Sequence, residues 1–94
     1  MFKSLTYVSV ASVPVTKSLL RNILASSLKN NKSLEITGML VYYDSTFIQV
    51  LEGFADHVSK IFEVISKDER HDNVVVLNEA EIEEREMGNG LSLY

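Results

Sequence analysis

The chain has 94 residues, which suffice for one small domain with a single hydrophobic core. Hydrophobic residues make up 46% of the chain and charged residues 23%, an ordinary balance for a globular protein that indicates neither disorder nor a transmembrane class. There is no cysteine, which excludes disulfides and thiolate metal sites, and the formal net charge of -4 disfavours nucleic acid as a partner. No apolar run is long enough to cross a bilayer and the first residues lack a signal-peptide pattern, so we expect a cytoplasmic domain without membrane contact.

The first third of the chain predicts a strand followed by an amphipathic helix. Residues 2–10 are rich in β-branched and aromatic side chains, which is typical of a strand, and Pro14 then ends it. From Thr16, whose hydroxyl suits a helix N-cap, apolar residues recur at helical spacing. The helix is expected to end at about Asn30 and Asn31, because asparagine favours caps and turns over helix interiors. Its apolar stripe consists of Leu19, Leu20, Ile23, Leu24 and Leu28.

The remainder predicts a hairpin, a second helix and a fourth strand. Residues 36–43 and 47–52 are typical of strands, and the Asp-Ser-Thr turn between them predicts a β-hairpin. Residues 55–66 carry apolar side chains at i, i+3, i+4 and i+7, the pattern of a helix. After a polar loop at 67–72, the unbroken apolar run of residues 74–77 predicts a strand that is buried on both faces.

The order of these elements is βαββαβ, with a short fifth strand expected at 91–93. This order is that of the α+β ferredoxin-like sandwich, an antiparallel or mixed sheet with two helices on one face. The first and third strands are central neighbours in this topology, which places Tyr7 beside Gln49. Since alternate strand residues share a face, Tyr7 lies on the same face as Leu5 and Ser9. If the helices cover that face, a phenol and a carboxamide meet inside the core.

Two groups of polar residues stand out against this background. Gln49 interrupts an apolar strand, and a buried amide needs hydrogen-bond partners. Tyr7 and Gln49 therefore form either a purely structural hydrogen bond or a contact to a polar ligand between the helices and the sheet. Asn30 and Asn31 form either an ordinary helix end or a pair of amides that face the same space.

A third polar group lies in the loop after the second helix. Asp68, Arg70 and His71 form either a solvated loop or a ligand site, in which Arg70 offers its planar fork of donors to a carbonyl or phosphate group. Asp68 would then accept hydrogen bonds from ligand hydroxyl groups. His57 is expected alone on the exposed side of the second helix, and the acidic segment 79–86 on a solvated face.

The patterns of common catalytic sites are absent from the sequence. It has no glycine-rich phosphate loop, no H-E-x-x-H helix and no nucleophile elbow. Two distant histidines without any cysteine give poor support for a metal site. The residues alone therefore predict a compact α+β domain with a polar pair in its core.

Four segments carry a more specific signal when they are taken together. They are LTYVSVA at 5–11, NNKSLEITGMLVYY at 30–43, FIQVLEG at 47–53 and SKDERHDNVVVL at 66–77. In order and spacing they resemble the BLUF family, blue-light sensor domains that use FAD. The resemblance implies that residues 1–94 form a single flavin-binding domain, with the ferredoxin-like fold and the flavin ring between two helices. FAD is the implied cofactor and FMN is the alternative, because the flavin tail projects beyond the matched motifs.

The resemblance also implies a role for each polar residue. Tyr7 would give an electron and a proton to the photoexcited flavin, while Gln49 would bridge the tyrosine to the flavin N5/O4 edge and rearrange. Asn31 would bond to the O4 side, with Asn30 as its neighbour at the ring, and the loop at 68–71 would contact the ribityl chain and the O2 side. The implied cofactor-binding set is Tyr7, Asn30, Asn31, Gln49, Asp68, Arg70 and His71.

The C-terminal segment departs from the family pattern. The last strand of the family carries R-x-F-x-x-W-x-M, whereas this chain has EREMGNGLS and contains no tryptophan. Arg85 fits the pattern and Met87 replaces the phenylalanine. Gly90 and Ser92 occupy the tryptophan and methionine positions. Family members commonly continue into helices that cover the far side of the sheet, while this sequence stops at Tyr94, so we expect a second copy to cover an exposed apolar face. Sedimentation that shows only monomer at high concentration would contradict such a homo-oligomer.

The resulting hypothesis is a blue-light photoreceptor that binds flavin non-covalently and signals to a downstream protein partner without turning over a substrate. The alternative is a degenerate ferredoxin-like interaction module that has lost its light output and works by binding protein. A third class, an acylphosphatase-like enzyme of related topology, would require an arginine–asparagine anion site, for which the sequence has no clear pattern. Colour separates the first two classes, because the flavin protein is yellow and the interaction module is colourless.

Overall fold

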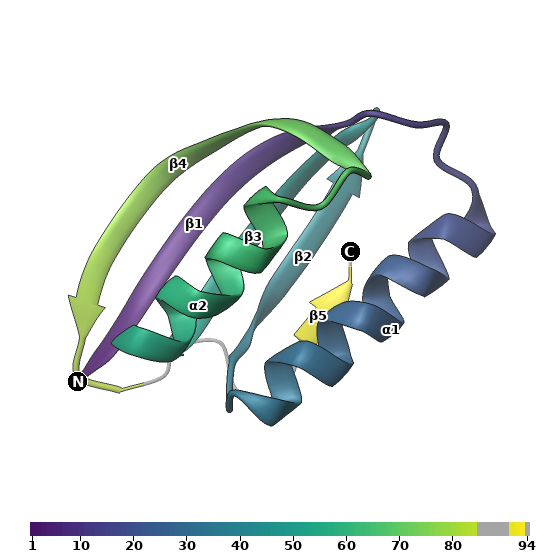
Figure 1. Ribbon diagram of the computed structural model, residues 1–94. Helices are drawn as coiled ribbons and strands as arrows, with labels where there is room; N and C mark the ends of the chain where they lie inside the picture. The colour runs from purple at the N-terminus through teal and green to yellow at the C-terminus, as the bar shows by residue number, and fades with distance from the viewer. Residues whose placement is uncertain (85–90, 94) are drawn as a thin grey trace.

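The computed structural model describes residues 1–84 and the backbone of residues 91–93. The strands of this part form one sheet in the order β4-β1-β3-β2-β5, antiparallel except for the β2–β5 pair. Both helices lie on the same face of the sheet (Figure 1). The predicted α+β ferredoxin-like sandwich is therefore confirmed, including the short fifth strand. The elements are β1 (Phe2–Ala11), α1 (Lys17–Ser33), β2 (Thr37–Tyr43), β3 (Thr46–Phe54), α2 (Ala55–Ser66), β4 (His71–Ile82) and β5 (Leu91–Leu93).

The hydrophobic core lies between α2 and the centre of the sheet. β1 and β3 pair with Tyr7 opposite Gln49, as the topology predicts. In Figure 1, α2 lies across these two strands, while α1 lies nearer to β5. The burial of each large apolar side chain here stabilises the fold by about 1.5 to 3 kcal/mol. The buried core residues are Leu5, Tyr7, Ile36, Leu51, Val58 and Ile61.

Helix α1 begins where it is predicted to begin but ends later. The Leu19 backbone N–H donates a hydrogen bond to Thr16 Oγ1 at 3.1 Å, which confirms the N-cap. The helix then continues past Asn30 and Asn31 to Ser33, so the predicted end at the asparagines is wrong. Tertiary packing overrides the local preference, because the Asn31 side chain is only 2% exposed and is held inside the domain.

The apolar stripe of α1 is only partly covered by the sheet. Leu19, Leu20, Ile23 and Leu24 are half-buried, and Leu28 is exposed. Among the residues of this helix, all of which the structure describes, only Asn31 is buried. Helix α1 therefore packs less closely on the sheet than α2 does, and the space beside it is where the candidate site lies.

Strand β4 is an exposed edge rather than the predicted strand with two buried faces. Val75 is 51% exposed, Val76 41% and Leu77 59%. The strand pairs with β1 along one side only within the described part of the chain, and α2 covers β1 and β3 instead. The prediction failed because β-branched residues favour extended backbone whether or not their side chains are covered. The glutamates at 79, 81, 83 and 84 are exposed as expected, and Glu79 pairs with Lys3 at 2.7 Å. Glu86 lies outside the described residues.

The prediction for His57 is also wrong. Its ring is half-buried, and its Nδ1 donates a hydrogen bond to the Leu34 carbonyl oxygen at 2.8 Å, which ties the start of α2 to the turn after α1. The periodicity of α2 could not reveal this contact, because the partner lies 23 positions earlier in the chain. The predicted pattern residues Arg85, Met87 and Gly90 lie outside the described residues.

Gly38 provides a test of how closely β2 and β3 are packed. A Cβ atom on this residue would lie 1.8 Å from the Val50 carbonyl oxygen, which is backbone and cannot move aside. We expect Gly38→Ala to lower the free energy of unfolding by roughly 3 kcal/mol or more, measured by urea denaturation. Gly53→Ala is the control, because its Cβ would meet the flexible end of the Ile36 side chain, and its loss should be clearly smaller. Equal losses would contradict the backbone clash.

Candidate functional site

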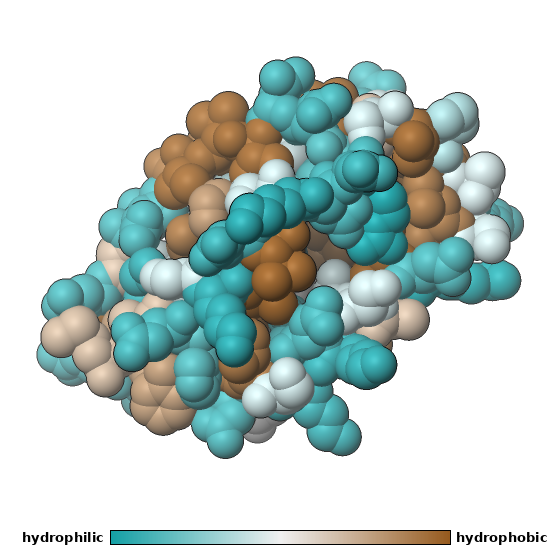
Figure 2. Space-filling model, in the orientation of Figure 1, coloured by the Kyte–Doolittle hydropathy of each residue, from teal (hydrophilic) through white to brown (hydrophobic). Residues whose placement is uncertain are grey.

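A cavity opens between the two helices on the helix-covered face of the sheet. It holds about 400 Å³ of space, part of which is open to solvent. Figure 2, in the same view as Figure 1, shows apolar side chains in the hollow between the helices, with hydrophilic residues around it. The lining comes from β1, α1, β2, β3, the end of α2, the loop at 67–70 and the start of β4. Its residues are Tyr7, Ile23, Ser27, Leu40, Phe47, Gln49, Ile65, Asp68, Arg70 and His71.

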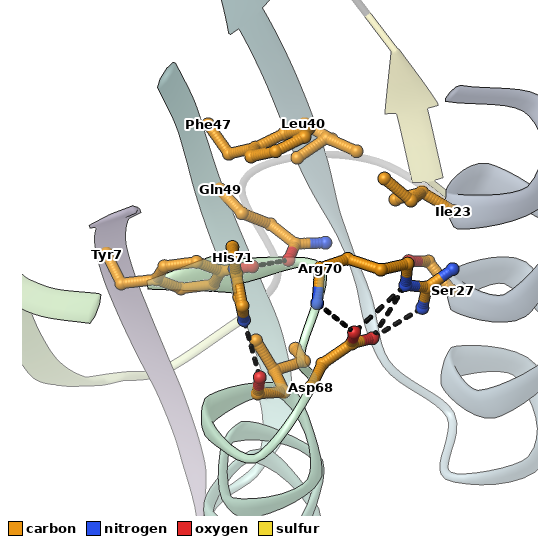
Figure 3. A pocket seen from close by; sticks show the side chains of 10 residues that line it. Tyr7, Ile23, Ser27, Leu40, Phe47, Gln49, Asp68, Arg70 and His71 are labelled. Carbon is orange, nitrogen blue, oxygen red and sulfur yellow. Dashed lines mark hydrogen bonds and ion pairs between the residues drawn. The ribbon is translucent and has the colours of Figure 1, made fainter. Parts of the chain in front are cut away.

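Tyr7 and Gln49 form the innermost polar contact of this cavity. The Tyr7 hydroxyl donates a hydrogen bond to Gln49 Oε1 at 2.6 Å, and the two side chains are 3% and 2% exposed. Because the amide oxygen is used in this way, the Gln49 Nε2 group is buried without a partner among the described residues. Figure 3 shows this nitrogen directed away from Tyr7 and toward α1. A buried amide donor left unpaired costs about 1 to 3 kcal/mol, so Nε2 is available to an acceptor beyond the described residues.

The two asparagines of α1 have different environments. Asn31 is buried, and its Nδ2 atom also lacks a partner among the described residues. Asn30 is exposed on the same turn. The domain thus holds two buried amide donors, on Gln49 and Asn31, that its own described residues leave unpaired. The binding roles of both asparagines stay predictions.

Asp68 and Arg70 form an ion pair at the cavity wall. Arg70 Nε donates to both carboxylate oxygens of Asp68, at 2.9 and 3.0 Å, and the Arg70 backbone N–H donates to Oδ1 at 2.9 Å. The hydrogen bond from Arg70 holds the pKa of Asp68 below its usual range, and the same bond raises the pKa of Arg70. Both groups therefore stay charged, in a part of the cavity wall where each side chain is about one third exposed.

His71 uses both of its ring nitrogens within the protein. Nδ1 lies 2.8 Å from Ser9 Oγ, and Nε2 lies 2.6 Å from the Ile65 carbonyl oxygen. Only the ring carbons are left to face the cavity. The role of His71 in binding a cofactor stays a prediction.

Sequence reasoning missed several residues of the lining. Ser27 lies on α1 one turn after Ile23, which the apolar stripe already includes, so helical spacing could have placed Ser27 on the cavity side as well. Ser9 shares a face with Tyr7, but nothing in the sequence indicates its contact with His71, 62 positions later. The described residues hold no group of acidic, histidine or cysteine side chains that could bind a metal ion. No helix in the same part of the chain is both long and apolar enough to span a membrane.

Burial makes the Tyr7 phenol a reporter of alkaline pH. Loss of solvent, and secondarily the negative charge of Asp68, raise the pKa of Tyr7 well above its ordinary value of 10.0. Above about pH 10 the unfolded chain loses this proton while the folded chain keeps it, so stability falls by about 1.4 kcal/mol per pH unit. Below the pKa of about 10 that Tyr7 has in the unfolded chain, the buried, protonated phenol makes its full contribution to stability. Urea denaturation between pH 9 and 11 should show this decrease of stability with pH in the wild type and not in Tyr7→Phe. Tyr43→Phe, which alters an exposed phenol, should show the same decrease as the wild type.

The chain matches one family model along most of its length. The model, described as BLUF, sensors of blue-light using FAD, covers residues 2–90. Among curated relatives, the photoactivated adenylate cyclase subunit beta of Euglena longa is 38% identical over 82 residues, which are 87% of this chain and 10% of that protein. The chain therefore spans about a tenth of the length of the curated relatives that it matches.

Solved structures show the same similarity in three dimensions. A bacterial light-regulated adenylyl cyclase superposes with a TM-score of 0.95 at 33% identity, over 100% of this chain and 28% of that chain. Klebsiella pneumoniae BlrP1 with FMN and cyclic diGMP superposes with a TM-score of 0.89 at 30% identity, over 100% of this chain and 25% of that one. In both cases the similarity covers one domain of a larger protein.

Proposed function

The chain belongs to the BLUF family of blue-light sensors, and on this premise we propose that residues 1–94 form a single flavin-binding domain that changes state when it absorbs blue light. The observation that carries the proposal is the buried hydrogen bond from Tyr7 to Gln49, which leaves Gln49 Nε2 unpaired at the wall of a cavity. FAD is the proposed cofactor and FMN the alternative, since BlrP1 has been solved with FMN.

The cavity suits a flat heteroaromatic ring. Ile23, Leu40 and Phe47 supply apolar contacts, while Gln49 supplies a donor at the inner edge. A flavin ring has an apolar body and an edge of nitrogen and carbonyl acceptors, so its two kinds of surface match the two kinds of lining.

The proposed binding residues include two buried amide donors and an ion pair at the cavity wall, and the two asparagines are not among the residues that line the cavity. Gln49 Nε2 and Asn31 Nδ2 are buried donors that would bond to acceptors of the ring. Asp68 and Arg70 would hold the polar chain attached to the ring, with Arg70 donating and Asp68 accepting from hydroxyl groups. Asn30 and His71 complete the proposed set. The exposure of Asn30 favours a place near the rim.

Tyr7 and Gln49 are the proposed photoactive pair. A bound flavin would supply absorption of blue light and an acceptor for one electron and one proton. Tyr7 gives up both, and its proton leaves along the hydrogen bond to Gln49 Oε1. The carboxamide of Gln49 has an acceptor end and a donor end, so rotation or tautomerisation changes which group faces the cavity. Return to the starting state is thermal, and no substrate is turned over.

The proposed output is a contact with another protein or domain. The two relatives named above as adenylate cyclases are much longer than this chain, which supports a sensor module that acts on a separate effector. The sheet face turned away from the helices bears exposed apolar residues, which supports the hypothesis of a homo-oligomer. These residues include Val10, Tyr43, Ile48 and Val75.

Absorption before and after illumination tests the proposal. The purified chain, reconstituted in parallel with FAD and FMN, should be yellow and should shift its flavin bands slightly to longer wavelength under blue light. The shift should reverse in the dark, because the return is thermal. Protein that stays colourless with both flavins would favour the protein-interaction module. A flavin-bound spectrum that does not change under light would mean that the chain binds flavin without signalling.

A further inference from the structure

His71 is held from two sides, next to the tyrosine of the proposed photoactive pair. One nitrogen contacts Ser9 Oγ on β1, and the other contacts the Ile65 carbonyl at the end of α2. The imidazole ring meets the Tyr7 ring edge-on, with 6.2 Å between centroids and an angle of 80°. Figure 3 shows the two rings side by side. Ser9 is fully buried, so its hydroxyl has no access to solvent.

The two contacts determine which nitrogen of His71 carries the proton. A carbonyl oxygen can only accept, so Nε2 must donate to Ile65. In the neutral ring Nδ1 is then unprotonated and must accept the hydrogen of the Ser9 hydroxyl. The opposite tautomer would place two lone pairs 2.6 Å apart, at Nε2 and the Ile65 oxygen.

We propose that Ser9 and His71 are a positioning pair for Tyr7: they hold the imidazole, protonated at Nε2, edge-on against the phenol ring and keep the phenolic proton directed at Gln49. Both ring nitrogens are committed elsewhere, so His71 cannot take this proton, and Gln49 Oε1 is its acceptor. Ser9 does not line the cavity, and its hydroxyl acts on Tyr7 through His71. The geometric part of this inference stands apart from the proposed function, while its consequence for the light response rests on that function.

Nitrogen-15 NMR of the imidazole rings tests the geometric part on the full chain at pH 8. His71 should be the tautomer protonated at Nε2. His57 donates from Nδ1 to Leu34 and should be the opposite tautomer, which gives an internal reference. Ser9→Ala removes the donor to Nδ1 but leaves the Ile65 carbonyl, so His71 should stay protonated at Nε2 while the Nδ1 resonance shifts because it loses its hydrogen bond. Ser18→Ala, which removes an exposed hydroxyl from α1, should leave both rings unchanged. A His71 ring protonated at Nδ1 in the wild type, or an unchanged His71 ring in Ser9→Ala, would overturn the inference.

The effect on Tyr7 is measured in the same two variants. The phenolic proton should exchange with water several-fold faster in Ser9→Ala than in Ser18→Ala. With FAD bound to equal occupancy, the yield of the light-shifted form should fall several-fold in Ser9→Ala only. Equal proton exchange in the two variants would refute the positioning role. If the wild type takes up no flavin, the proposed function fails, and the tautomer and exchange measurements still decide the inference.

Discussion

Replacement of Tyr7 by phenylalanine should abolish the light-induced shift while flavin stays bound. The variant keeps the aromatic ring between Phe62 and His71 but removes the only group of this residue that can lose a proton. The hydroxyl points at Gln49 Oε1 and not into the cavity, so flavin affinity should change by less than the value of one hydrogen bond, about 1 kcal/mol. Flavin absorption, recorded in the dark and after blue light, measures both effects.

A control variant and a stability measurement show whether the loss of the light response is specific to the Tyr7 hydroxyl. Tyr43→Phe removes a hydroxyl from a residue that is 79% exposed, and its light response should equal that of the wild type. Tyr7→Phe also leaves the Gln49 carbonyl without its donor, which should lower the free energy of unfolding by about 1 to 3 kcal/mol. A normal red shift in Tyr7→Phe would show that Tyr7 is not the electron and proton donor.

The arrangement of the sheet could be predicted from the sequence because each element carries its own periodicity. Alternation marks the strands and i, i+3, i+4 spacing marks α2, and few topologies accommodate the order βαββαβ. From that topology the pairing of Tyr7 with Gln49 follows without further information. The exposure of β4 does not follow, because an apolar run predicts a strand but does not indicate whether another element covers it.

The site could be predicted only in part. Gln49 is identifiable because an amide in an apolar strand needs partners, and both the hydrogen bond and the unpaired nitrogen are present. The identity of those partners was inferred from the resemblance to the BLUF family and not from the spacing of residues. The contacts of His71 and His57 join segments that lie far apart in the chain, each through a single side chain. Such contacts produce no periodic pattern in the sequence. For the same reason the role of Ser9 becomes visible only in the folded structure.

Replacement of Gln49 by leucine should likewise leave flavin bound and remove the light response. Leucine fills a similar volume but offers neither the acceptor for the Tyr7 proton nor the donor that Nε2 directs toward the cavity. The loss of one neutral hydrogen bond to the ring should weaken flavin binding by about 1 kcal/mol, or about fivefold. Titration with FAD and difference spectra under blue light measure the two effects. Asn22→Leu, which removes an exposed amide from α1, should change neither.

The stability of the flavin-free Gln49→Leu variant provides an independent check on the contact itself. Leucine eliminates one unpaired buried amide but leaves the Tyr7 hydroxyl without an acceptor, so the two changes oppose each other. In the Tyr7→Phe/Gln49→Leu double variant neither polar group remains, and its stability should be close to that of the wild type. A cycle of the two single variants and the double variant should give a coupling of about 1 to 3 kcal/mol. Simple additivity would mean that the phenol and the amide are not bonded in solution, and a normal light response in Gln49→Leu would refute the amide rearrangement.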